Sequence, residues 1–243
     1  MKVKPVRVGI LGGDYPLVTA AFEFRLLKGW YRFMPPIAKQ EFPSIISFNA
    51  TLKGAGLDKP NRRAEYLEQV GKTIQMFEEN GCKFLLIPCN KLQTLSKEIK
   101  TFTAMRTVDA VSATVERIKQ RYGNRKELVV KVLAPGDGEE GPLYEAALRE
   151  AGLNVGELST FAKYKLEEAA FDIRLKGPLD EIGDRLMRDL QAEDEFARNK
   201  VVCLIANNEL TLVRHQLSKL RVEDSMVELV YAAGKAIAEH QLG

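Results

Sequence analysis

Apolar residues fall into short continuous runs that alternate along the chain with longer amphipathic segments. Continuous apolar runs without polar alternation are typical of strands buried on both faces, as in parallel sheets. The segments between them carry apolar residues at helical spacing and several end at glycine or proline. The predicted strands are residues 6–11, 44–49, 83–87, 102–108, 128–135, 153–157 and 201–206, and the predicted helices are residues 17–33, 61–80, 109–122, 142–152, 163–173, 178–196 and 225–241. Strands that alternate with helices predict an α/β fold with parallel sheets.

The second half of the chain repeats the order of motifs found in the first half. IPCNKL (87–92) corresponds to IANNEL (205–210) at an offset of 118, and each lies at the end of a predicted buried strand. VGILGGD (8–14) likewise corresponds to VKVLAPGD (130–137), and RTVD (106–109) corresponds to RVED (221–224). Three matches in the same order indicate that the chain consists of two similar halves.

The predicted architecture is therefore two pseudo-symmetric α/β domains, each a parallel sheet flanked by helices. The first comprises residues 1–108 plus the helix at 225–243, and the second comprises residues 109–224. Open α/β sheets bind ligands beyond the carboxyl ends of their strands. We expect these ends to form one cleft between the domains, with Cys89 on one wall and its counterpart Asn207 on the other.

Composition excludes several classes of function. Lys plus Arg total 36 against 33 for Asp plus Glu, and the absence of a dense basic run argues against a nucleic-acid partner. No apolar segment approaches the roughly 18 residues of a membrane span. Three cysteines without a CxxC pair, together with only two histidines, argue against a disulfide framework, a metal site and a histidine-based triad. A cytoplasmic protein is expected.

Cys89 is the main candidate for chemistry because it comes directly after a predicted buried strand. The alternative is that Cys89 is a small buried core thiol. Cys82 follows a helix-ending glycine and Cys203 lies inside a predicted strand, so both are interpreted as structural. The turn at residues 12–16 is rich in glycine but is not a GxGxxG fingerprint, so no dinucleotide cofactor is expected.

Three motifs resemble the aspartate/glutamate racemase superfamily, and the resemblance extends over nearly the whole chain. GILGGDYP (9–16) is similar to the family's GxLGGMGP-like turn, IPCNKLQ (87–93) to its PCNT motif, and ANNEL (206–210) to its GCTEL motif. The resemblance implies a cofactor-independent, homodimeric enzyme with two domains and the site between them. In this family, one thiolate removes the α-proton of a carboxylate substrate and a second thiol returns a proton on the opposite face.

The resemblance implies a role for each matching position. Cys89 takes the place of the first proton-transferring thiol, and Asn207 stands where the second cysteine is expected. Asn90 would orient the substrate or the thiol, with a turn cap as the alternative role. Arg62 and Lys176 match the cations that hold the substrate carboxylate, with solvated surface charge as their alternative. The further candidates for substrate binding are Asp14, Tyr15, Lys91 and Asn208.

The departures from the family pattern are concentrated at the site. Asn207 replaces the second cysteine, and its amide exchanges no proton at a useful pH. Three readings stay open. The first is an aspartate/glutamate racemase-like isomerase that acts at the α-carbon of an amino acid or related carboxylate through Cys89, with Asp14 or Lys91 as the second acid/base. The second is a one-cysteine lyase, decarboxylase or cis–trans isomerase of a dicarboxylate, and the third is a non-catalytic carboxylate-binding relic of the fold.

Overall fold

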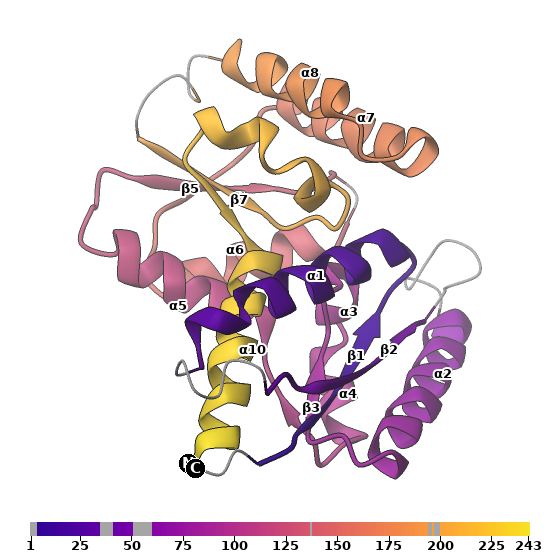
Figure 1. The fold of residues 1–243 in the computed structure, drawn as a ribbon. Helices are drawn as coiled ribbons and strands as arrows, with labels where there is room; N and C mark the ends of the chain where they lie inside the picture. The colour runs from indigo at the N-terminus through magenta and orange to yellow at the C-terminus, as the bar shows by residue number, and fades with distance from the viewer. Residues whose placement is uncertain (1–3, 35–40, 51–59, 137, 194–195, 197–199) are drawn as a thin grey trace. The chain divides into compact units, whose positions relative to one another are not determined.

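The computed structural model describes residues 4–34, 41–50, 60–136, 138–193, 196 and 200–243, and for residues 60–62 it describes the backbone alone. These residues form an α/β protein with two four-stranded parallel sheets flanked by helices (Figure 1). The chain divides into two compact units. Unit 1 comprises residues 1–109 and 229–243, and unit 2 comprises residues 110–228. The α/β class predicted from the apolar runs is confirmed.

The sheet of unit 1 has the strand order β2-β1-β3-β4, and every neighbouring pair is parallel. Its elements are β1 (Arg7–Gly12), α1 (Pro16–Gly29), η1 (Trp30–Arg32), β2 (Ser44–Asn49), α2 (Pro60–Glu79), β3 (Phe84–Leu86), α3 (Asn90–Gln93), α4 (Ser96–Thr101) and β4 (Arg106–Thr107). The helix α10 (Ser225–Leu242) begins in unit 2 and continues into unit 1.

The sheet of unit 2 has the order β6-β5-β7-β8 and is also parallel throughout. Its elements are α5 (Ala110–Tyr122), β5 (Val129–Leu133), α6 (Glu140–Glu150), β6 (Val155–Gly156), α7 (Thr160–Lys176), α8 (Asp180–Gln191), β7 (Val201–Ile205), η3 (Leu210–Val213), η4 (Gln216–Lys219) and β8 (Val222–Asp224). The order is that of unit 1 with β5 to β8 in place of β1 to β4. The prediction of two similar α/β halves is therefore confirmed.

The central strands are covered on both faces, as their uninterrupted apolar sequences predict. In unit 1, Leu11 of β1 and Leu85 of β3 belong to a buried cluster with the α2 residues Ile74 and Phe77. Phe84, the neighbour of Leu85, points to the opposite face and its ring contacts that of His240 on α10. Figure 1 shows α2 and α10 on opposite sides of this sheet. Alternate residues of one strand thus pack on different helices.

One predicted strand is much shorter in the structure. The prediction placed a strand at residues 102–108, but β4 covers only Arg106–Thr107. The backbone N–H of Ala104 donates to the Glu78 carboxylate at 2.9 Å, and that of Met105 donates to Thr103 Oγ1 at 2.9 Å. Because side chains accept the hydrogen bonds that a strand would direct to its neighbour, pairing starts only at Arg106.

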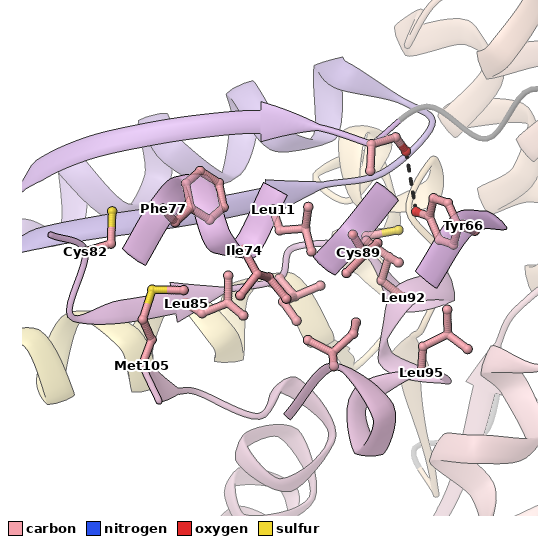
Figure 2. Close-up of a cluster of buried hydrophobic side chains, with 14 residues drawn as sticks. Leu11, Tyr66, Ile74, Phe77, Cys82, Leu85, Cys89, Leu92, Leu95 and Met105 are labelled. Carbon is pink, nitrogen blue, oxygen red and sulfur yellow. Dashed lines mark hydrogen bonds between the residues drawn. The ribbon is translucent and has the colours of Figure 1, made fainter. Parts of the chain in front are cut away.

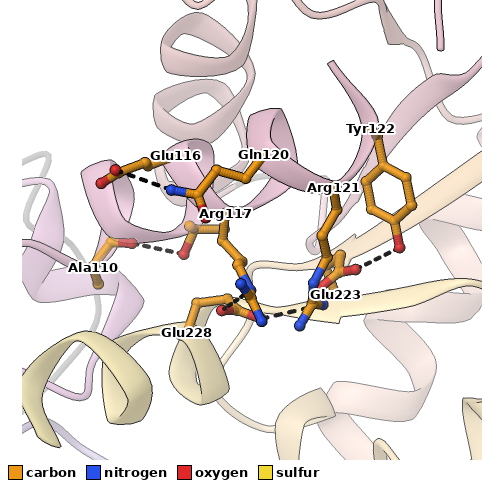
Figure 3. A network of polar contacts seen from close by, with 9 residues as sticks. Ala110, Glu116, Arg117, Gln120, Arg121, Tyr122, Glu223 and Glu228 are labelled. Carbon is orange, nitrogen blue, oxygen red and sulfur yellow. Dashed lines mark hydrogen bonds and ion pairs between the residues drawn. The ribbon is translucent and has the colours of Figure 1, made fainter. Parts of the chain in front are cut away.

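A buried polar network occupies the side of unit 2 where α5 faces β8 and the start of α10 (Figure 3). The side chains of Glu223 and Glu228 are only 2% and 5% exposed. Arg121 forms an ion pair with Glu223, and the Tyr122 hydroxyl donates to the same carboxylate at 2.6 Å. Arg117 and Arg121 each lie 3.6 Å from the Glu228 carboxylate. Two buried carboxylates therefore share two arginines.

Burial and, to a smaller extent, the neighbouring Glu223 carboxylate raise the pKa of Glu228, Arg121 and Arg117 oppose the shift, and the net pKa is about 7. The two arginines do not bring the pKa of Glu228 back to its usual value, because both lie 3.6 Å from its carboxylate. Arg121 forms its closer ion pair with Glu223 instead. Burial and the hydrogen bond to Glu223 likewise raise the pKa of the Tyr122 hydroxyl to about 12. The network therefore holds one carboxyl group that titrates near neutrality.

Among the helices that the structure describes, none has the length and hydropathy needed to cross a membrane. Within the same residues, no group of three or more His, Cys, Asp and Glu side chains is arranged to hold a metal ion.

Candidate functional site

Cys89 comes just after the carboxyl end of β3, as the sequence predicts, and directly precedes the short helix α3. Since β1 and β3 are neighbouring parallel strands, the turn after β1 reaches the same sheet edge. A Cβ atom added at Gly13 would lie 2.4 Å from Cys89 Sγ, which is closer than two such atoms can approach. The glycine turn and the thiol are therefore in direct contact.

The segment that carries Cys89 is held by Gln93, the last residue of α3. Gln93 Nε2 donates to the carbonyl of Ile87 at 2.8 Å, and the Gln93 backbone N–H donates to the carbonyl of Cys89 at 3.1 Å. Cys89 itself is extended, with φ of −146° and ψ of 108°. These bonds fix the end of the strand that carries the thiol, and Cys89 as a whole residue is 3% exposed.

Tyr66, on α2, is a neighbour of Cys89 that the sequence does not reveal. Both side chains are buried in the same cluster, and Figure 2 shows the Cys89 sulfur pointing toward the Tyr66 ring. The Tyr66 hydroxyl donates to the carbonyl of Ala50 at 3.4 Å. Burial raises its pKa well above the usual range, and the nearby Cys89 and Asp14 raise it further. A neutral hydroxyl therefore stands beside the thiol.

Asp14 and Lys91 bring charge to this sheet edge. Asp14 Oδ2 lies 3.9 Å from Lys91 Nζ, and the two side chains are 40% and 36% exposed. An ion pair this long and this open to solvent contributes about 0–1 kcal/mol, so either group is readily turned toward a ligand. Tyr15, the residue before α1, is half-buried, and its carbonyl accepts the N–H of Val18 at 3.0 Å.

The three asparagines of the two strand-end motifs differ in their surroundings. Asn90 is fully buried as the first residue of α3. Asn207, the counterpart of Cys89, is also buried, and its Oδ1 accepts a hydrogen bond of 3.0 Å from the backbone N–H of Leu210 at the start of η3. Asn208 is half-buried. Asn207 thus acts as a cap in unit 2.

The two predicted carboxylate-binding cations belong to helices α2 and α7. Lys176 is the last residue of α7 and its Nζ lies 2.9 Å from Asp172 Oδ1, one helical turn earlier. Arg62 lies in the first turn of α2, and its side chain is outside the described residues. Of the predicted site residues, the structure brings Asp14, Lys91 and Cys89 together in unit 1, whereas Asn207, Asn208 and Lys176 belong to unit 2. The predicted cleft between the domains stays a prediction.

The remaining cysteines lie outside this group. Cys82 is buried beyond the end of α2, and burial raises the pKa of its thiol. Cys203 is buried inside β7. Within the described residues, Cys89 is therefore the cysteine that stands at the carboxyl edge of a sheet with charged groups beside it. A thiol in that setting is equipped to take or give one proton, or to attack a ligand.

Replacing Gly13 with alanine tests the contact between the turn and the thiol. The added methyl group meets Cys89 Sγ, so we expect the free energy of unfolding to fall by about 1–3 kcal/mol, the usual cost of overpacking. Urea unfolding measures the change. Gly71→Ala is the matched control, because a Cβ at this position in α2 meets nothing within 4 Å and alanine favours the helix. Equal stability of Gly13→Ala and the wild type would show that the contact is absent.

No protein-family model matches the chain. Solved structures do resemble it. An aspartate racemase homologue from Pyrococcus horikoshii superposes with a TM-score of 0.69 at 16% identity, covering 96% of this chain and 99% of the other. The aspartate racemase of Picrophilus torridus gives 0.69 at 17% identity, covering 96% and 94%. The glutamate racemase of Francisella tularensis in complex with D-glutamate gives 0.65 at 13% identity, covering 98% and 82%. The chain therefore has the two-domain fold of the aspartate and glutamate racemases.

Proposed function

We propose that this protein is a divergent, cofactor-independent member of the aspartate/glutamate racemase superfamily. In this proposal it acts as an isomerase at the α-carbon of an amino acid or a related carboxylate, through acid/base chemistry at Cys89. The cytoplasmic location and the homodimer expected from the sequence belong to the same proposal.

The observation that supports the proposal best is the position of the Cys89 thiol. It stands at the carboxyl end of a central strand, against the Gly13 turn, with Asp14 and Lys91 at the same edge. Ligands of open α/β sheets bind at this edge. A thiol that only fills space in the core requires neither a glycine in contact with its sulfur nor an ion pair nearby, so these two features favour a chemical role for Cys89.

The proposed reaction uses groups of unit 1. The Cys89 thiolate takes the α-proton: an S–H bond forms, the C–H bond breaks, and its electron pair moves into the substrate carboxylate. Lys91 attracts that carboxylate, and Asp14 favours a cationic group such as an α-amine. The Lys91 ammonium, or an Asp14 carboxyl group that has first taken up a proton from water, then gives a proton to the opposite face of the carbon. The Cys89 thiol afterwards releases its proton to water, which also restores the donor. Because the sulfur is nearly buried, binding has to displace side chains that cover it.

A second candidate is a one-cysteine lyase, decarboxylase or cis–trans isomerase of a dicarboxylate. The capping role of Asn207 favours it, because the motif of unit 2 then supplies no proton and chemistry is left to one thiol. Cys89 would act there as base, acid or nucleophile on a single face of the substrate.

Hydrogen exchange with solvent distinguishes these functions. The protein is incubated in deuterium oxide with aspartate, glutamate, other amino acids and dicarboxylates, and proton NMR follows each substrate. Loss of an α-proton signal is the expected result. Turnover without α-exchange, such as loss of a carboxyl group or a change at a double bond, would favour the second candidate. Binding of a carboxylate without any turnover would support the third alternative, a non-catalytic carboxylate-binding relic of the fold.

A further inference from the structure

Tyr66 and Cys89 form a polar pair inside an otherwise apolar cluster. Ile74, Leu92 and Leu95 belong to the same cluster, and all of these side chains are buried. Figure 2 shows the two polar groups at one end of it, with the sulfur directed toward the tyrosine. A hydrogen bond in such surroundings is stronger than one in water, and a buried charge without a donor is costly.

The existing bond of the Tyr66 hydroxyl is a weak one. Its acceptor, the carbonyl of Ala50 at the end of β2, is 3.4 Å away, whereas hydroxyl bonds are usually about 2.5–3.0 Å long. A phenolic hydrogen prefers the ring plane but can turn about the C–O bond over a small barrier, so it can leave this carbonyl for a better acceptor. A thiolate is such an acceptor, because hydrogen bonds to charged groups are roughly twice as strong as neutral ones.

We propose that Tyr66 is a positioning residue whose hydroxyl turns from the Ala50 carbonyl to the Cys89 sulfur when the thiol ionises, and so stabilises the thiolate. Neither the sequence motifs nor the resemblance assign a role to this tyrosine. The inference rests on the proposed function only in that Cys89 reacts as a thiolate.

The charges around the pair support this direction of donation. Asp14 and an ionised Cys89 both lie close enough to oppose ionisation of the phenol, and burial opposes it more strongly still. Tyr66 therefore keeps its proton, which makes it a donor and excludes it as a base. Lys91 adds positive charge at the same edge, but the Asp14 carboxylate beside it offsets that charge. The phenol is thus a neutral donor beside the sulfur, and in the resting protein it donates to the Ala50 carbonyl.

The test is a titration of Cys89 without any substrate. Thiolate absorbance near 240 nm is followed against pH, and the signal of the matching Cys89→Ser protein is subtracted in each background. Tyr66→Phe is expected to move the midpoint of the Cys89 signal upward by about one pH unit, a tenfold loss in ionisation. Tyr144→Phe, at a buried tyrosine of α6 in unit 2, is the control and should leave the midpoint unchanged.

An unchanged midpoint in folded Tyr66→Phe would overturn the inference and reduce Tyr66 to a packing residue. If that variant fails to fold, uniform incorporation of 3-fluorotyrosine retains the ring and makes its hydroxyl a stronger donor. The midpoint should then move downward, and no shift would again overturn the inference. Because no turnover is measured, failure here is separate from failure of the proposed function, which the exchange experiment decides.

Discussion

Replacing Cys89 with serine should lower solvent-hydrogen exchange at the substrate α-carbon by at least roughly 10³-fold, with binding of the same substrate within about threefold of wild type. A serine hydroxyl has nearly the size of the thiol but is not ionised at neutral pH, so proton removal is lost while the shape of the site is kept. Proton NMR in deuterium oxide measures exchange, and calorimetry measures binding.

Cys82→Ser is the matched control for this substitution. Cys82 is also a buried thiol of unit 1, and burial raises the pKa of that thiol, which keeps it protonated and away from chemistry. Exchange by Cys82→Ser should therefore equal that of wild type. If Cys89→Ser exchanged as fast as Cys82→Ser, the thiol at the end of β3 would have no part in proton transfer.

Replacing Glu228 with glutamine should remove a pH-dependent loss of stability from unit 2. The pKa of Glu228 is raised from 4.5 to about 7 in the folded protein, so its stabilising contribution is complete below about pH 4.5. As the pH rises, the unfolded chain releases this proton first, and the contribution is lost by the time the pH exceeds about 7. Glutamine resembles the protonated carboxyl group at every pH.

The expected result is equal stability of wild type and Glu228→Gln near pH 4, and a variant more stable by roughly 3 kcal/mol at pH 8. Urea unfolding at several pH values measures the difference, in which the other titrating groups cancel. Glu116→Gln is the control, because Glu116 is exposed on α5 and contacts Gln120 outside the buried network (Figure 3). A difference between wild type and Glu228→Gln that stays constant from pH 4 to pH 8 would contradict the burial of a titrating carboxyl group.

The main elements of the fold are predictable because burial on two faces leaves a visible pattern. Runs such as VRVGIL and VVCLIA become β1 and β7, and Gly81 and Gly152, which the pattern places after helices, have positive φ of 73° and 80° beyond α2 and α6. The short elements leave no such pattern. The four-residue α3 shows no helical period. Two of the three residues of β8 are acidic, and its buried Glu223 meets Arg121 rather than apolar residues.

The candidate site is only partly predictable, because the strand pattern shows which strand ends are neighbours but not which distant side chains pack against them. The contact between Gly13 and Cys89 follows from two strand ends that are neighbours in a parallel sheet, which a strand pattern supports. Tyr66 lies far from both in sequence, and nothing in its local pattern separates it from an ordinary core tyrosine. Asp172 and Lys176 stand at positions i and i+4 of one helix, so the sequence shows that they can form an ion pair. It does not show whether Lys176 binds Asp172 or a ligand.

The hydrogen bond from the Leu210 N–H to Asn207 affects how easily a cysteine could be placed in the strand-end motif of unit 2, to match Cys89 in unit 1. A cysteine at position 207 would place a thiol in the second motif but would remove the acceptor of the buried Leu210 N–H. Loss of that acceptor costs about 1–3 kcal/mol, a large share of the margin by which a domain stays folded. Installing that cysteine by a single substitution is therefore opposed by local stability, and compensating changes near η3 would be needed to offset the cost. The hydrogen bond of one buried amide thus helps to keep the two strand-end motifs chemically different.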